Sequence, residues 1–159
     1  AVDEAAQPVE QANASRLKCA SGCADCCVDG LTVFAIEAEE IVKHHAAVLD
    51  EAPHPPGACA FLDDARRCRI YEHRPYVCRT QGLPLRWLEE DEETDEVFEA
   101  RDICPLNLEG PPLEELPAEE CWSIGPFEER LAREQTKGER VSLRALFAAD
   151  DRRRLPVVK

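Results

Sequence analysis

The sequence lacks long apolar runs: no stretch approaches the roughly eighteen consecutive apolar residues of a membrane-spanning helix. The first fifteen residues also lack the charged-then-apolar order of a secretory signal. We therefore expect neither membrane insertion nor export. The sequence begins at Ala1 and contains no Met, so we expect that an initiator residue or a longer leader has been removed. A cytoplasmic location is expected, with an organelle interior after leader cleavage as the alternative.

Basic residues are scarce as well. Lys and Arg number 19 against 33 Asp and Glu, which gives a formal net charge of −14. Nucleic acids and anionic membranes bind basic surfaces, so an acidic chain is not expected to bind either of them.

Large side chains for a hydrophobic core are few, because the chain has nine aromatic residues and no Met. Small cores are often reinforced by disulfides or by a metal ion, since buried apolar area alone barely offsets the conformational entropy lost on folding. The nine cysteines are the obvious source of such reinforcement.

Length and composition predict a single domain. We predict a small α+β fold that is mostly helical and loop-rich and is organised around a cysteine-ligated metal site. The predicted organisation is a flexible or weakly helical arm at 1–16, the metal-binding domain at 17–150 and a tail at 151–159.

Apolar spacing, helix-dipole signals and proline positions predict helices at about 37–49, 123–135 and 142–149. Residues 58–88 show no lasting helical periodicity and predict compact irregular structure, with room for a short hairpin. The run at 89–96 carries seven carboxylates in eight positions, which predicts a solvated loop.

Four cysteines lie within nine residues, and four more follow at wider spacing. The first group is Cys19, Cys23, Cys26 and Cys27, and the second is Cys59, Cys68, Cys78 and Cys104. A spacing such as that of Cys23 and Cys26 lets one tight turn direct two sulfurs at one metal, either zinc or iron. Adjacent residues such as Cys26 and Cys27 rarely bind one ion together, so they serve two metals or only one of them is a ligand. A fold that joins both groups would explain eight thiols.

A disulfide framework is the alternative for a small cysteine-rich chain. It is disfavoured by the absent export signal, the odd number of cysteines and the strain of a bridge between adjacent cysteines. Thiolate-bound metals carry net negative charge and need nearby cations, and the second cysteine group is accompanied by such residues: Arg66, Arg67, Arg69, Arg74 and Arg79. Of the histidines, His44, His45 and His54 are expected to be exposed, and His73 could be a ligand.

Two segments carry a resemblance to a known family. They are Cys19-Ala-Ser-Gly-Cys23-Ala-Asp-Cys26-Cys27, and Cys59-Ala-Phe-Leu-Asp followed by Cys68-Arg-Ile-Tyr-Glu-His-Arg-Pro-Tyr-Val-Cys78-Arg. Over 19–104 the chain resembles the CxxCxxCC cysteine-cluster proteins (YkgJ-like), a proposed zinc- or iron-chelating domain. The first gap is one residue longer than the family name implies.

The resemblance implies eight metal ligands: Cys19, Cys23, Cys26, Cys27, Cys59, Cys68, Cys78 and Cys104. Cys121 is then the odd thiol. Tyr71, Arg74 and Arg79 match the signature and are expected to surround the bound metal or cofactor.

Three functions follow as hypotheses. The first is a zinc- or iron-chelating protein, and the second is an iron–sulphur protein, with a [4Fe–4S] cluster as one form, in electron transfer or as a subunit of a larger complex. The third is a thiol redox or metal-transfer protein that keeps one adjacent cysteine uncoordinated. The expected partners are a metal ion and a protein or larger complex. No catalytic residue is predicted, and enzymatic activity has no support in the sequence.

Overall fold

Each half of the fold is built from two stretches of chain that are distant in sequence. The computed structural model describes residues 2–134 and 140–152. It divides into two compact units, of which unit 1 combines Ala1–Cys19 with Arg79–Glu128, and unit 2 combines Ala20–Cys78 with Glu129–Lys159. The predicted bounds of 17–150 for one domain stay a prediction. Most of the predicted tail at 151–159 lies outside the described residues.

Unit 1 begins with a helix, α1 (Val2–Ala12), where the sequence predicts a flexible or weakly helical arm. Ala6 and Val9 are buried on this helix. Just after it, the Asn13 side-chain amide donates to the carbonyl of Glu120 at 2.8 Å. The segment is therefore helical and packed within unit 1.

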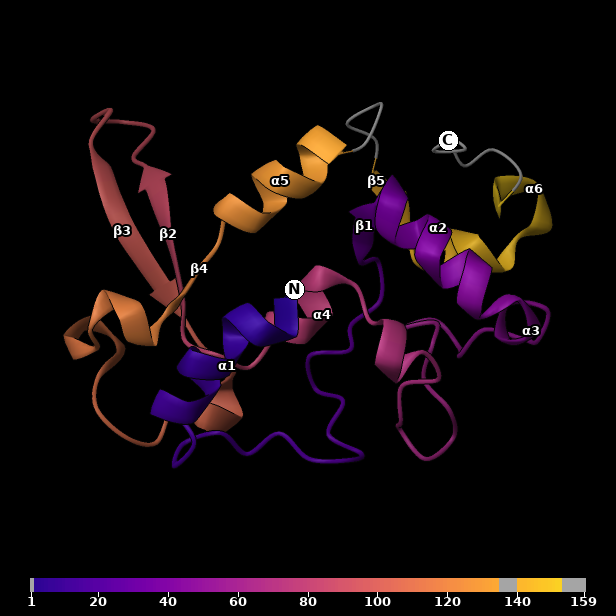
Figure 1. Ribbon diagram of the computed structural model, residues 1–159, viewed down its shortest axis with the longest axis horizontal. Helices are drawn as coiled ribbons and strands as arrows, with labels where there is room; N and C mark the ends of the chain where they lie inside the picture. Colours follow the sequence, from indigo (N-terminus) through magenta and orange to yellow (C-terminus); the bar gives the residue numbers. More distant parts are fainter. Residues whose placement is uncertain (1, 135–139, 153–159) are drawn as a thin grey trace. The chain divides into compact units, whose positions relative to one another are not determined.

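A three-stranded sheet in the order β3-β2-β4 forms the rest of unit 1 (Figure 1). β2 (Leu85–Glu90) pairs antiparallel with β3 (Val97–Asp102), and β4 (Trp122–Ser123) pairs parallel with β2. Three short 3-10 turns accompany these strands: η2 (Pro105–Asn107), η3 (Leu113–Glu115) and η4 (Ala118–Glu120).

The acidic run at 89–96 is exposed except for the half-buried Asp91. This agrees with a solvated segment, but the run forms the last two residues of β2 and the turn that leads to β3. The Asp91 carboxylate accepts hydrogen bonds from the backbone N–H groups of Glu93 and Thr94, both at 2.9 Å. These bonds close the turn although the neighbouring carboxylates repel one another.

Unit 2 pairs β1 (Thr32–Phe34) with β5 (Arg140–Ser142) in antiparallel register. Helix α2 (Ala35–His44) follows β1 directly. Its first turn is fixed by Glu37, whose carboxylate accepts a hydrogen bond from the Phe34 N–H at 3.1 Å. The predicted helix at 37–49 is correct in place but interrupted, because His45 leaves helical geometry before α3 (Ala46–Leu49).

The end of the described chain differs from the predicted helix at 142–149. Residues there finish β5, form the 3-10 turn η5 (Ala145–Phe147) and enter α6 (Ala149–Arg152). The predicted helix at 123–135 is shorter, as α5 (Pro126–Glu134), because β4 takes up Ser123; Gln135 lies outside the described residues. Between α3 and β2 lie η1 (Tyr71–His73) and α4 (Tyr76–Thr80) in largely irregular chain.

The hydrophobic core of unit 2 draws on both of its stretches. Its fully buried members include Val33, Ile41, Leu49, Phe61, Ile70 and Leu146. Leu146 lies among side chains of the first stretch, so the C-terminal segment completes this core.

The described residues thus contain helices and mainly antiparallel strands, which fits an α+β fold. The prediction that the fold is mostly helical is not shown, because the described residues also form the β2–β3 hairpin and the β1–β5 pair, which were not foreseen. None of the helices in the described ranges has the length and hydropathy of a membrane-spanning segment.

Candidate metal centre

Three segments of unit 2 bring cysteines together. Cys26 and Cys27 lie in tight turns after Cys23, closed by the bond from the Cys27 N–H to the Ala24 carbonyl at 3.0 Å. The Cys59 N–H donates to the Cys27 carbonyl at 2.8 Å, which joins the first and second cysteine segments. Cys68 forms an isolated β-bridge with Leu62.

Cys78 lies in α4, a one-turn helix anchored from α2. The Glu37 carboxylate accepts a hydrogen bond from the Tyr76 N–H at 2.5 Å as well as from Phe34. Glu37 therefore fixes the first turns of both α2 and α4, and with them the position of Cys78.

The thiols of these segments influence one another's ionisation. Burial raises the pKa of Cys78 to about 12, and charges on Cys59, Cys68 and Cys26 raise it as well. Burial is also the first cause of the raised pKa values of Cys59 and Cys68, and charge on Cys59 adds to the shift at Cys68.

The adjacent pair is asymmetric. A hydrogen bond from the Cys27 thiol lowers the pKa of Cys26 to about 6, against the opposing effect of burial. The same bond raises the pKa of Cys27, and burial and charges on Cys26, Cys59 and Cys78 raise it further. One thiolate beside one thiol is the expected state of this pair near neutral pH.

Cations partly offset this repulsion. Positive charge on Arg74 lowers the pKa values of Cys26, Cys68 and Cys78. Arg69 and Arg144 act in the same direction on Cys59.

The three residues predicted to surround the metal differ in their contacts. The Arg74 guanidinium lies 3.7 Å from the centre of the Tyr71 ring, and Tyr71 is 61% exposed. Arg79 belongs to unit 1, where it pairs with Asp3 at 2.6 Å. Their roles around a metal stay predictions.

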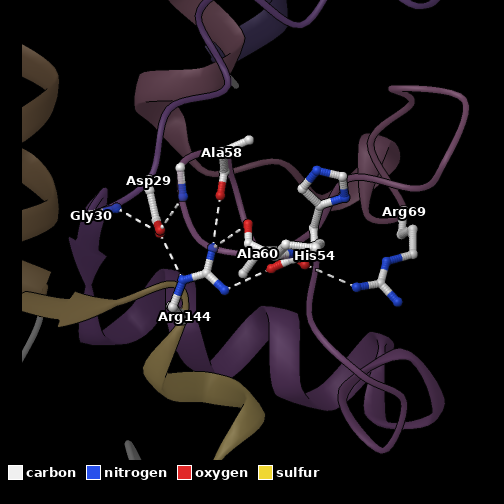
Figure 2. A network of polar contacts seen from close by, with 9 residues as sticks. Asp29, Gly30, His54, Ala58, Ala60, Arg69 and Arg144 are labelled. Atoms are coloured by element: carbon white, nitrogen blue, oxygen red, sulfur yellow. Dashed lines mark hydrogen bonds and ion pairs between the residues drawn. The ribbon is translucent and has the colours of Figure 1, made fainter.

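Arg144 was not foreseen as part of the site. It forms an ion pair with Asp29 at 2.7 Å, and this bond lowers the pKa of Asp29 to about 2. Figure 2 shows the guanidinium contacting Asp29 and the carbonyls of His54 and Ala58. The sequence offered no signal for this contact, since Arg144 is an ordinary basic residue far along the chain.

The remaining cysteines, Cys19, Cys104 and Cys121, belong to unit 1. The buried Asn107 side-chain amide donates to the Cys19 sulfur at 3.7 Å, and its backbone N–H donates to the Cys104 carbonyl at 2.8 Å. Cys121 is buried, with the Arg101 guanidinium donating to its sulfur at 3.9 Å. That Cys19 and Cys104 share one site with the thiols of unit 2 stays a prediction.

The histidines form a contact that was not predicted. His45 Nε2 lies 3.0 Å from His73 Nδ1, and the His44 ring stacks on His73 with 4.2 Å between centroids. His44 is exposed as expected, whereas His45 and His54 are half-buried, which corrects the prediction that all three are exposed. His45 is covered because it packs against η1.

None of the cysteines forms a disulfide in the described part of the chain, which goes against the disulfide alternative. Within residues 2–134 and 140–152, no group of three or more His, Cys, Asp or Glu side chains is arranged so that it could hold one metal ion. The donor chemistry fits zinc or iron, because thiolates bind both. The predicted organisation of the fold around a metal site is thus not seen in these positions.

Comparison with protein families gives one match. The family model CxxCxxCC, which its description gives as a proposed zinc- or iron-chelating domain, matches residues 18–105. No curated protein and no solved structure matches the chain. The matched range covers more than half of the sequence and contains all the cysteines except Cys121. The chain therefore belongs to the CxxCxxCC family.

Proposed function

We propose that this protein chelates a zinc or iron ion through cysteine thiolates of unit 2. The proposed ligands come from Cys26, Cys27, Cys59, Cys68 and Cys78, and charge on other thiols of this set raises the pKa values of Cys27, Cys68 and Cys78. Cys19, Cys23 and Cys104 remain proposed as further ligands on the family pattern.

The observation that carries this proposal is the mutual repulsion of the thiolates. Charges on the neighbouring cysteines raise the pKa values of Cys27, Cys68 and Cys78. A divalent cation among these sulfurs would replace the protons and neutralise the repulsion, so metal binding would stabilise the fold. Inert buried thiols would not need a charge partner.

Binding would also require the sulfurs to move closer together, since no group of three is spaced for one ion among the described residues. Cys26 and Cys27 lie in short turns, Cys59 in irregular chain and Cys68 at an isolated β-bridge, so this movement would not have to break a helix or a named strand. Free energy of metal binding commonly drives ordering of this kind.

Metal analysis of purified protein tests the proposal. Protein prepared without oxygen and without added metal is expected to contain zinc or iron, measured by plasma mass spectrometry. Colourless zinc protein indicates a structural or chelating role, whereas iron with sulfide and a brown colour indicates an iron–sulphur centre. Protein without metal would contradict the proposal.

A matched pair of variants ties the metal to unit 2. Cys59→Ser removes one of the proposed thiol ligands of unit 2 and is expected to lower the metal content. Cys121→Ser removes a thiol of unit 1, and the serine hydroxyl can still accept a hydrogen bond from Arg101. This variant is expected to retain the metal. Equal metal content in both variants would exclude Cys59 as a ligand.

A thiol redox or metal-transfer role is the second candidate, and the state of Cys26 favours it. A thiol with a pKa of about 6 is mostly thiolate at neutral pH, which is the reactive form. Alkylation of metal-free protein followed by peptide mass spectrometry is expected to label Cys26 first. Protection of Cys26 in metal-loaded protein would favour chelation over this role.

A further inference from the structure

Arg144 joins the C-terminal segment of unit 2 to two loops of its first stretch (Figure 2). Its Nε donates to the Asp29 carboxylate at 2.7 Å. One terminal nitrogen donates to the His54 carbonyl at 2.7 Å, and the other donates to the carbonyls of Ala58 at 2.8 Å and Pro55 at 3.3 Å. A single guanidinium thus binds one loop at Asp29 and the other loop at three backbone carbonyls.

The Asp29 carboxylate also contacts both loops. It accepts hydrogen bonds from the backbone N–H of Gly30 at 2.9 Å and from that of Gly57 at 3.0 Å. Arg144 and Asp29 therefore each contact both loops, and the ion pair between them lies where the loops meet.

The two loops carry cysteines next to these contacts. Asp29 is two residues after Cys27, and Ala58 immediately precedes Cys59. The Cys59 N–H donates to the Cys27 carbonyl at 2.8 Å, so the loops are also joined at the cysteines themselves.

The segment that supplies Arg144 is firmly held in unit 2. The Leu143 N–H donates to the Leu31 carbonyl at 3.0 Å, and Leu143 and Leu146 are buried in the core of this unit. The backbone that carries the Arg144 side chain is therefore held in place by the core of unit 2. This segment lies beyond residues 18–105, where the family model matches.

We propose that Arg144 is a positioning residue of the metal centre, which holds the Cys27 and Cys59 loops together so that both sulfurs can serve one ion. The metal-binding unit of this chain therefore includes the C-terminal segment around Arg144 and extends beyond the family-matched residues. The proposal rests on the proposed function, metal chelation by unit 2.

The fork of the guanidinium is essential to this role. It reaches four acceptors in two directions at once, whereas a Lys ammonium is a compact group at the end of a flexible chain. Arg144→Lys keeps the positive charge beside Cys59 but loses most of the bridge between the loops. Arg144→Gln loses both the charge and most of the bridge.

Zinc affinity, measured by competition with a chelator, is the first readout. We expect Arg144→Lys and Arg144→Gln each to lose about 10–100-fold in affinity, the usual cost of removing a group that orients a ligand. Arg140→Gln is the matched control, because Arg140 lies in the same segment but donates to Thr32, at 2.8 and 3.1 Å, and lies over the Phe34 ring, away from the Asp29 and Ala58 contacts. It is expected to keep the affinity of the original protein.

The outcomes separate the possible failures. Wild-type affinity in Arg144→Lys would overturn the positioning role, whether or not Arg144→Gln is impaired. If the original protein binds no zinc, the proposed function fails, and hydrogen exchange of the Gly57 and Cys59 amides then tests the bridge alone. Faster exchange in Arg144→Lys supports it, and unchanged exchange overturns it. If circular dichroism shows that the Arg144 variants do not fold, Asp29→Asn replaces them with the same expected loss.

Discussion

The pH dependence of metal affinity follows from the ionisation of the clustered thiols. Cys27, Cys59, Cys68 and Cys78 have raised pKa values and carry protons at neutral pH, whereas Cys26, with a pKa of about 6, is mostly thiolate. Thiolates are the metal-binding form, so each protonated ligand must release its proton on binding. Affinity therefore rises with pH.

The size of this effect depends on the number of protons released. A site of four thiolates that includes Cys26 releases about three protons per metal ion near pH 7, so the association constant rises about 1000-fold per pH unit, or about 4 kcal/mol. Below about pH 5.5, where Cys26 is also protonated, the slope approaches about four protons.

Calorimetry of zinc binding in two buffers with different ionisation enthalpies measures the proton release directly. A chelator competition series between about pH 5 and 8 gives the same number as a slope. Release of about three protons at neutral pH agrees with thiolate ligation by this cluster. Release of one proton or none would exclude ligation by this thiol cluster, because the ligands would then be carboxylates or neutral groups.

Three further predictions concern stability. Leu146→Ala should lower the free energy of unfolding in urea by about 2–5 kcal/mol, because Leu146 is fully buried in the core of unit 2; a loss below about 1 kcal/mol would contradict that burial. Gly82→Ala should cost about 1–3 kcal/mol more than Gly125→Ala in the same assay. Both glycines have positive φ, but only at Gly82 would the new Cβ lie 2.8 Å from the Cys19 sulfur, so equal losses would argue against this contact. Burial lowers the pKa of His45, so protonation is disfavoured in the folded state and the melting temperature should fall as the pH drops through the ordinary range of histidine. His45→Gln should weaken that dependence, and an unchanged pH profile would exclude His45 as its source.

Local sequence signals predicted part of the fold. Glu37 and the apolar spacing after it placed a helix correctly, but the break at His45 could not be foreseen. The His45 ring contacts His73, which is 28 residues away in sequence, and contacts of this kind leave no local pattern. The acidic run correctly predicted a solvated turn, but its charge gave no sign of the strands β2 and β3 that the turn connects.

The candidate site shows the same division. The motif spacing pointed to the segments that carry Cys26, Cys27, Cys59, Cys68 and Cys78, and the structure brings these segments into electrostatic reach of one another. The bridge through Arg144 depends on pairing of β1 with β5, which are more than a hundred residues apart in the chain. Long-range pairing of this kind also explains why 142–149 is not a helix.

X-ray absorption spectroscopy of the metal-loaded protein tests chelation by thiolates most directly. We expect a first shell of sulfur atoms around the metal, at about 2.3 Å if the metal is zinc, and loss of sulfur from that shell in Cys59→Ser. A shell made up only of oxygen or nitrogen at about 2.0–2.2 Å would contradict this expectation, because the clustered thiols of unit 2 would then not hold the metal.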